Sequence, residues 1–231
     1  MSQDNSQQDA WKALVGEASA QLVEDGMVIG LGTGSTASQF IRALARRIQR
    51  GLRIVGAAAS SQASQELAAS LGIPITNLDT HPELDLYIDG ADEIDPQLRL
   101  IKGAGGALLR EKIMASAARR FVVIGDDSKL VDQLGHRYPL PVEVCPFAAT
   151  PVRKQLEVLA ASVQLRQKDG EVFMTENSNI IFDLTFPDGI SNPVDLDERI
   201  QRIVGVVETG LFLQMAQSAL IGGVKGVQTL P

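Results

Sequence analysis

Closely spaced carboxylates follow an apolar segment near the middle of the chain. The segment Asp89-Gly90-Ala91-Asp92-Glu93-Ile94-Asp95 comes directly after a strand predicted over residues 84–88. Open α/β sheets bind their ligands at the carboxyl ends of strands, which is where these acids would lie. A solvated acidic loop is the alternative, whereas an EF-hand calcium loop is disfavoured because its alternating ligands and distal glutamate are missing. Gly90 allows close backbone approach, which favours a ligand site.

A cationic, glycine-rich turn, Lys102-Gly103-Ala104-Gly105-Gly106, comes shortly after these acids. In a partly dry cleft Lys102 could neutralise nearby carboxylates and donate to an oxygen that becomes negative during a reaction. Glu111 lies on the helix that this turn opens. Two leucines before it could shield it enough to act as a base, yet Arg110 and Lys112 beside it fit a solvated helix face equally well.

A second glycine-rich segment, Gly30-Leu31-Gly32-Thr33-Gly34-Ser35-Thr36, follows a predicted strand and opens a helix. Backbone amides at a helix start favour an anion, and phosphate is the natural ligand. The dinucleotide fingerprint fails because Ser35 replaces its last glycine and the next strand lacks a ribose-binding acid. The P-loop pattern fails because no Gly-Lys pair is present. The alternative is a tight turn with Ser or Thr capping the helix.

The remaining reactive residue types offer little chemistry of their own. Cys145 is the single cysteine and is predicted to pack in the core, while His81 and His136 are expected in surface loops. Lys129 follows a strand predicted over 121–124, a position that alone is typical of the surface. No G-x-S-x-G elbow is present. A metal-free acid–base mechanism is therefore the expectation.

Composition points to a globular protein. Of 231 residues, 45% are hydrophobic and 21% charged, with a formal net charge of -7. This acidic balance disfavours nucleic acid or an anionic membrane as partner. No apolar stretch reaches the roughly 18–20 residues that span a bilayer. The polar start lacks a signal-peptide pattern, so we expect a cytoplasmic protein.

The elements that would position these residues alternate in the first half of the chain. Helical spacing over 11–22, 40–48, 61–71 and 107–118 alternates with strand-like runs at 27–31, 53–59, 74–78, 84–88, 98–101 and 121–124. Such alternation predicts a doubly wound parallel sheet, an α/β fold.

The alternation of helices and strands ends at about residue 130, and several prolines interrupt the chain that follows. A helix over 152–161 and hairpin-linked strands at 163–166, 171–175 and 179–186 predict an α+β insert. Helices are then expected over 198–207 and 211–216, and a terminal strand over 219–228. We assign residues 1–130 plus 206–231 to a Rossmann-like catalytic domain and 131–205 to the insert.

Taken together and in order, the motifs resemble a known family. Gly30 to Ala37, Asp89 to Ile94, Lys102 to Ala107 with Glu111 behind it, and Ser128-Lys129 closely resemble ribose-5-phosphate isomerase of the A type. The resemblance implies interconversion of D-ribose 5-phosphate and D-ribulose 5-phosphate in the pentose phosphate pathway, without metal or cofactor. It also implies a Rossmann-like domain with a smaller ferredoxin-like α+β domain inserted, and a homodimer or homotetramer.

The resemblance also assigns roles to residues of this chain. Glu111 matches the catalytic base, with Asp89, Asp92 and Lys102 as further catalytic groups. The matched substrate-binding residues are Lys12, Thr33, Gly34, Ser35, Thr36, Asp89, Gly90, Ala91, Asp92, Lys102, Gly103, Ala104, Gly105 and Lys129. Ala104 stands where many family members have glycine.

Two other functions remain open on the residues. One is a non-catalytic sugar-phosphate sensor, which would need a DNA-reading module for which the sequence offers no basic helix-turn-helix segment. The other is a different sugar-phosphate isomerase, a deaminase or an acyl-CoA transferase on a similar fold. Glu111 alone would not separate these, whereas the Asp89 to Asp92 run combined with Lys102 favours the isomerase.

Overall fold

The computed structural model describes residues 2–231, with side chains from residue 7 onward. Its contacts divide the chain into two compact units. The first unit holds the chain up to Ala91, Arg110–Lys129 and Met215–Pro231, and the second holds Asp92–Leu109 and Leu130–Gln214. The domain boundaries drawn from the sequence stay a prediction. The contact-based units differ from them by placing 92–109 and 206–214 in the second unit.

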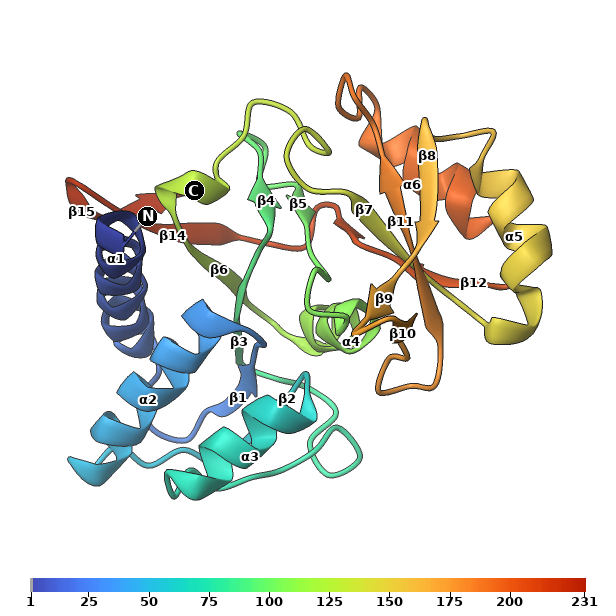
Figure 1. Cartoon of the computed structure of the whole chain (residues 1–231). Helices are drawn as coiled ribbons and strands as arrows, with labels where there is room; N and C mark the ends of the chain where they lie inside the picture. The colour runs from blue at the N-terminus through green and yellow to red at the C-terminus, as the bar shows by residue number, and fades with distance from the viewer. Residues whose placement is uncertain (1) are drawn as a thin grey trace. The chain divides into compact units, whose positions relative to one another are not determined.

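A six-stranded sheet forms the centre of the first unit, in the order β15-β14-β6-β3-β1-β2 (Figure 1). The strands are β1 (Val28–Leu31), β2 (Gly56–Ala59), β3 (Leu86–Gly90), β6 (Phe121–Asp126), β14 (Ser218–Gly223) and β15 (Gly226–Leu230). Every pairing except that of β15 with β14 is parallel. The chain leaves β1 for β2 on one side and then reaches β3 on the other. Strand order therefore reverses at β1, and such reversals are where open α/β sheets bind ligands.

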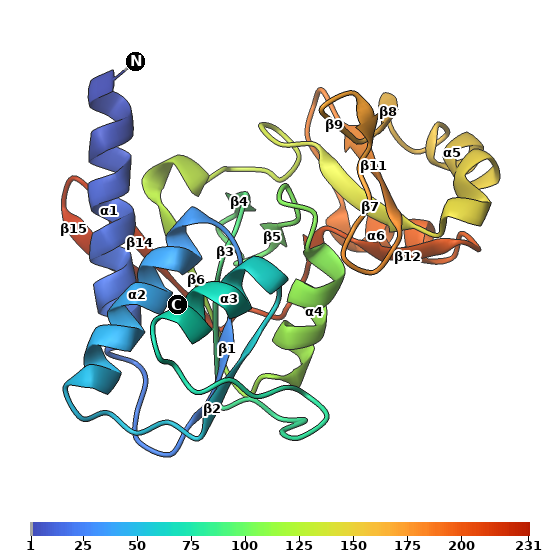
Figure 2. The ribbon, with the colours of Figure 1, turned by 60° about the horizontal axis from the view of Figure 1, so that its bottom comes forward.

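Helices connect the strands of this sheet and pack on it. They are α1 (Ser2–Ala20), α2 (Ser35–Gln49), α3 (Gln62–Ser70) and α4 (Leu108–Ala117), with a 3₁₀ turn η1 at Asp127–Lys129. Helices α1 and α2 lie side by side (Figure 2) and share a core with the alternate strand residues Ile29, Leu31 and Ile88. The opposite strand positions include Tyr87 and Phe121, whose rings stack at 4.9 Å.

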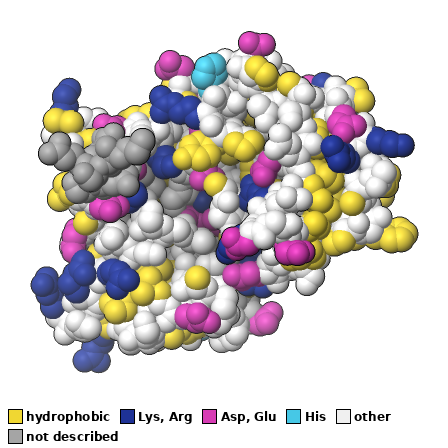
Figure 3. Space-filling model, viewed as in Figure 1, with side chains coloured by type: hydrophobic (Ala, Val, Ile, Leu, Met, Phe, Trp, Pro, Cys, Tyr) yellow, Lys and Arg dark blue, Asp and Glu magenta, His cyan; other side chains and the backbone are white. Residues whose placement is uncertain are grey.

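The last turn of α2 is basic. Arg46 and Arg47 lie there, where cations complement the negative end of the helix dipole. Lys and Arg atoms gather over the region where α2 ends (Figure 3). The net negative charge of the chain thus coexists with a local basic surface far from the carboxyl ends of the strands.

The second unit contains an antiparallel sheet in the order β12-β7-β11-β8. Its elements follow as β7 (Leu140–Val144), η2 (Pro146–Ala148), α5 (Ala149–Leu156), β8 (Ser162–Leu165), β11 (Ile180–Thr185), α6 (Pro193–Gln201) and β12 (Val206–Thr209). This βαββαβ succession is the ferredoxin-like arrangement expected from the resemblance. A short hairpin, β9 (Gln167–Lys168) and β10 (Glu171–Val172), links β8 to β11. A smaller sheet pairs β13 (Leu211–Phe212), β5 (Leu100–Ile101) and β4 (Glu93–Ile94).

Several elements near the C-terminus differ from the prediction. The helix expected over 198–207 ends at Gln201, because Gly205 has a φ of 104° and the chain then pairs with β7 as β12. The helix expected over 211–216 is wrong, since Leu211 and Phe212 pair with β5. The single strand expected over 219–228 is a hairpin that turns at Val224 and Lys225, after which Gly226, with a φ of 86°, begins β15. In the first two cases pairing with a strand far away in sequence overrides helical spacing.

Two smaller expectations also fail. The segment 74–78 forms only an isolated bridge between Ile75 and Ala57, so it borders the sheet without becoming a strand. Cys145 is exposed rather than packed, because it follows Val144, the last core residue of β7, and precedes η2.

Candidate active site

Asp89 is a buried carboxylate held by several hydrogen bonds. It lies in β3 beside the strand reversal and is fully buried. Its Oδ1 accepts hydrogen bonds from the backbone amides of Thr33 (2.9 Å) and Gly90 (2.7 Å), and its Oδ2 accepts from the Tyr87 hydroxyl (2.5 Å). A buried carboxylate needs such donors. Asp89 thereby fixes the loop after β1 against the end of β3.

Gly32 makes this approach possible. A Cβ at this position would lie 2.1 Å from Oδ1 and 2.3 Å from Cγ of Asp89. The Gly32 amide meanwhile donates to the Ile88 carbonyl at 2.9 Å, which continues the β1–β3 pairing. The glycine-rich loop is therefore shaped by its close packing on a carboxylate and not only by its turn.

Serines that the sequence analysis overlooked support the same loop. The Thr33 hydroxyl bonds the hydroxyls of Ser60 and Ser61 at 2.8 Å each, and Ser64 donates to the Gly32 carbonyl at 2.7 Å. Ser61 also caps α3 by accepting from the Ser64 amide. The signal available in the sequence was a Ser-Ser pair at the carboxyl end of a strand, one strand away from the glycine loop.

The loop ends at the start of α2, where an anion would be favoured. Gly34 occupies the N-cap with a φ of 102° and, within the described chain, no side chain caps this helix. The capping alternative weighed for Ser35 and Thr36 is thus wrong. Uncapped amides and the positive helix end favour a phosphate. Gly34 and Ser35 are exposed, so a ligand can reach them.

Two lysines lie at the carboxyl edge of the same sheet. Lys12 belongs to α1 next to Trp11, whose carbonyl lies against Gly222 near the end of β14. Its ammonium is 3.3 Å from Asp9. Lys129 ends η1, directly after β6, and is partly buried. Both cations therefore belong to the edge at which the glycine loop and Asp89 lie.

Tyr87 is a buried residue that sequence reasoning missed. Its pKa is raised well above 10, first because burial disfavours the phenolate and then because the charges of Asp89 and Glu111 repel it. The ring therefore stays a hydrogen-bond donor to Asp89. Its position two residues before Asp89, on the same face of β3, was the available signal.

We expect Tyr87→Phe to remove a pH dependence of stability. Because the folded-state pKa is raised, the contribution of Tyr87 is complete below about pH 10 and is lost as the pH rises further, by up to about 1.4 kcal/mol per pH unit. Urea unfolding between about pH 9 and pH 11 measures this slope. The free energy of unfolding should fall less steeply with pH in the variant than in the wild type. The same slope in both proteins would contradict a raised pKa for Tyr87.

Glu111 is buried, so the solvated-face interpretation of its helix is wrong. It lies in the first turn of α4 and is only 5% exposed. Its charge acts on the Tyr87 hydroxyl, which places it on the same side of the first unit as Asp89. A shielded carboxylate near a hydrogen-bonded aspartate is the arrangement that acid–base chemistry requires.

The second unit holds the rest of the acidic segment. Asp92 is half-buried, and its Oδ2 accepts from the Ala104 amide at 2.9 Å. Glu93 is fully buried and accepts from the amides of Gly135, Arg137 and Tyr138 at 2.6–2.8 Å. Glu93 thus anchors a loop, while Asp92 holds the glycine turn. The solvated-loop interpretation of this acidic segment is therefore wrong.

Lys102 is also buried, with 2% of its surface exposed. Its amide donates to the Gly210 carbonyl at 2.9 Å, and its ammonium lies 5.4 Å from the centre of the Phe212 ring. Gly103 after it has a φ of 102° and packs on Leu108 and Pro141, whereas Ala104 and Gly105 are exposed. The turn thus presents the exposed Gly105 next to a sheltered cation, while the Ala104 amide is bonded to Asp92.

The predicted site residues are consequently divided between the two units. Lys12, Thr33, Gly34, Ser35, Thr36, Asp89, Gly90, Ala91, Glu111 and Lys129 belong to the first, and Asp92, Lys102, Gly103, Ala104 and Gly105 belong to the second. The first unit brings Thr33, Asp89 and Glu111 around Tyr87. The second brings Asp92 to the turn that follows Lys102.

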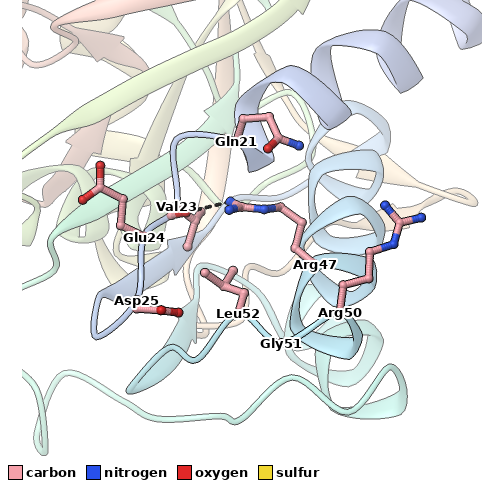
Figure 4. A pocket seen from close by; sticks show the side chains of 8 residues that line it. All are labelled: Gln21, Val23, Glu24, Asp25, Arg47, Arg50, Gly51 and Leu52. Atoms are coloured by element: carbon pink, nitrogen blue, oxygen red, sulfur yellow. Dashed lines mark hydrogen bonds between the residues drawn. The ribbon is translucent and has the colours of Figure 1, made fainter.

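A hollow elsewhere on the first unit does not share this chemistry. Gln21, Val23, Glu24, Asp25, Arg47, Arg50, Gly51 and Leu52 line it (Figure 4). Arg47 donates to the Val23 carbonyl at 2.6 Å, so its guanidinium closes the end of α1. These residues precede β1 and β2, which places the hollow at the amino ends of the strands.

Two further searches concern metals and membranes. Among the described residues, no group of three or more His, Cys, Asp or Glu side chains is arranged to hold a metal ion. Within the same part of the chain, no helix is long and apolar enough to cross a bilayer.

The Rossmann-like sheet, with acid–base groups and a glycine loop at its carboxyl edge, is the arrangement of an α/β enzyme. The family described as ribose 5-phosphate isomerase A (phosphoriboisomerase A) matches residues 56–226. This chain belongs to that family, which confirms the resemblance drawn from the motifs.

Individual relatives agree. The ribose-5-phosphate isomerase A of Bacillus mycoides is 47% identical over 94% of this chain and 97% of its own. The solved structure of ribose 5-phosphate isomerase A from Methanocaldococcus jannaschii superposes with a TM-score of 0.90 at 40% identity, covering 96% of this chain and 98% of that one. A D-ribose-5-phosphate isomerase solved in complex with phospho-erythronic acid has a TM-score of 0.91 at 38% identity, covering 96% and 97%.

Proposed function

We propose that this enzyme interconverts D-ribose 5-phosphate and D-ribulose 5-phosphate through an enediolate, without a metal ion, in the non-oxidative pentose phosphate pathway. The observation that carries the mechanism is the burial of Glu111 beside the Tyr87–Asp89 pair. Membership of the family supports the substrate. The protein would act in the cytoplasm as a homodimer or homotetramer.

Glu111 is the proposed proton carrier. An aldose becomes a ketose when the C2 proton leaves, an enediolate forms, and a proton returns to C1. If the proton leaves C2 and returns to C1 on the same face of the planar enediolate, one carboxylate can perform both transfers. Asp89 and Asp92 would bind sugar hydroxyls, and one of them would assist ring opening or proton exchange between the oxygens.

The negative charge of the enediolate requires donors. Lys102 and the amide of the exposed Gly105 would supply them, since fixed donors in a sheltered site stabilise developing charge most effectively. A relative has been solved in complex with phospho-erythronic acid, a phosphorylated sugar acid, which supports a sugar phosphate as the substrate.

Metal independence rests on the acid–base groups, because proton transfer by a carboxylate requires no metal ion. Asp89 and Asp92 accept hydrogen bonds from backbone amides and, for Asp89, from the Tyr87 hydroxyl, and these bonds orient the two carboxylates. Their remaining lone pairs can accept sugar hydroxyls.

The decisive assay follows ketose formation from ribose 5-phosphate by purified, chelator-treated enzyme. Run in deuterium oxide, it should also show solvent deuterium entering the product, as proton removal requires. Turnover that disappears with the chelator and returns with a metal would refute the metal-free mechanism. Turnover only with glucosamine 6-phosphate or a CoA ester would refute the substrate, and binding without turnover would indicate a sensor.

We expect Lys129→Ala to raise KM chiefly, with kcat near that of the wild type. Phosphate anchoring is uniform binding, because substrate and transition state carry the same phosphate. An ion pair between Lys129 and the phosphate, partly shielded from water, should contribute about 1 kcal/mol or slightly more to the binding free energy. Its loss should therefore raise KM on the order of tenfold. A steady-state titration with ribose 5-phosphate measures this. Lys154→Ala, on α5 of the second unit, is the matched control, and a pure kcat defect in Lys129→Ala would contradict the role.

A further inference from the structure

The Arg166 side chain joins the glycine turn to the antiparallel sheet of the second unit. Its Nε and Nη2 donate to the two carboxylate oxygens of Asp183 at 2.8 Å and 2.5 Å. Its Nη1 donates to the carbonyls of Gly103 and Ala104 at 2.8 Å and 3.1 Å. The two charged side chains are only 14% and 21% exposed, so water competes little for these bonds.

The sheet fixes where this guanidinium lies. Asp183 lies in β11, which pairs with β8, and Arg166 follows β8 and donates its amide to the Ile181 carbonyl at 2.8 Å (Figure 1). Asp183 grips the guanidinium through two parallel bonds, which is the planar recognition that arginine allows and lysine does not. The third nitrogen is thereby aimed at the turn.

A second contact holds the far end of the turn. The Phe173 amide donates to the Arg166 carbonyl at 3.0 Å, and the Phe173 ring lies 6.0 Å from the guanidinium. A Cβ at Gly106 would lie 2.4 Å from two atoms of that ring. The turn is thus held by its carbonyls at Gly103 and Ala104 and by direct packing at Gly106.

Holding the carbonyls fixes the amides of the same peptide groups. A trans peptide is planar, with its carbonyl and amide pointing in opposite directions. The described peptide bonds are all trans. When Arg166 draws in the Gly103 carbonyl, the Ala104 amide points the other way, where it donates to Asp92 at 2.9 Å. When Arg166 draws in the Ala104 carbonyl, the exposed Gly105 amide also points away from the guanidinium.

We propose that Arg166 is a positioning residue for catalysis: with Asp183, it sets the direction of the Gly105 amide that stabilises the enediolate and of the Ala104 amide that holds Asp92. The inference rests on the proposed function and deepens it. In this role Arg166 acts through the turn, because its guanidinium nitrogens bond Asp183 and the carbonyls of Gly103 and Ala104. Its effect should therefore fall on the transition state, where the direction of a donor matters most, and hardly on substrate binding.

The test compares Arg166→Lys with Arg99→Lys, a matched control whose part-buried guanidinium bonds Asp95 in the turn between β4 and β5. Lysine keeps the charge but cannot bond the carboxylate and two carbonyls in one plane. Losing one such oriented donor costs about 10²–10³ in kcat and misdirecting it costs less, so kcat should fall about tenfold to a hundredfold. KM should change less than about threefold.

A structural role alone would lower the melting temperature and leave kcat per folded molecule intact. Chemical rescue separates the two. Guanidinium ion at a concentration below denaturation should restore kcat of Arg166→Ala in part, whereas ammonium at equal ionic strength should not. Asp183→Asn should lower kcat in the same sense, and its effect should not add to that of Arg166→Lys because the two side chains act as a unit.

The outcomes distinguish the two claims. Wild-type enzyme that does not convert ribose 5-phosphate overturns the proposed function, and the positioning role with it. An active wild type with Arg166→Lys and Asp183→Asn at wild-type kcat overturns the positioning role alone. A rise in KM with unchanged kcat would overturn it as well, since that would make Arg166 a contributor to substrate binding.

Discussion

Replacing Glu111 by glutamine should lower kcat at least about a hundredfold while the protein stays folded. The amide preserves the shape of the side chain but cannot accept the C2 proton, and positioned acid–base catalysis contributes about 10²–10⁴-fold. KM should change little, because Glu111 acts on the carbon atoms and not on the phosphate. Ketose formation and deuterium entry should fall in parallel, since both depend on the same proton transfer.

Glu66→Gln is the matched control, because Glu66 lies on α3 of the same unit and pairs only locally with Gln62 at 2.9 Å. It should retain wild-type turnover. Near-normal kcat in Glu111→Gln would refute the role of Glu111 as the base. If deuterium still enters the substrate while ketose formation stops, Glu111 would instead act in a later proton transfer.

Gly32→Ala should abolish most activity through the packing of the loop on Asp89. A methyl group 2.1 Å from Oδ1 cannot be accommodated without moving the carboxylate or the loop. Either movement breaks the Thr33–Asp89 bond and shifts the amides at the start of α2. A displacement of about 1 Å can cost about a hundredfold, and we expect kcat/KM to fall by at least that factor. Overpacking should also cost about 1–3 kcal/mol of stability.

Gly72→Ala is the control for the stability loss. Gly72 has a φ of 78° with open space around it, so alanine there costs about 1–2 kcal/mol without a clash. That variant should keep its activity at a temperature where both proteins are folded. Activity retained in Gly32→Ala would show that the Asp89 carboxylate is free to move and does not determine the loop.

The catalytic motifs could be predicted from the sequence because their chemistry is local. Asp89 and Thr33 each follow an apolar strand, and parallel strands end at a common edge, so their proximity follows from the pattern. The fold class follows from the same alternation. Glu111 was ambiguous because its sequence neighbours include both leucines and cations, and only the packing of α4 decides that it is buried.

Other features depend on non-local pairing that the sequence does not display. Arg166 and Asp183 meet only because β8 and β11 adopt a particular register, and a shift by one residue would turn either side chain to the other face. Tyr87 was missed for a different reason: its partner Asp89 is only two residues away, but the sequence does not show that the two side chains are buried together. The segment after Gly205 was taken for helix because its pairing with β7 involves residues far away in sequence.

The position of β14 bears on how the chain is made. β14 lies between β6 and β15, and the Phe121 amide bonds the Gln217 side chain across a sequence separation of 96 residues. During synthesis, at about 5–20 residues per second, the edge of β6 that pairs with β14 therefore stays unpaired for several seconds before β14 is synthesised. Unpaired strand edges invite association with other chains. Nascent chains that stall after β6 should accordingly be the species most dependent on chaperones.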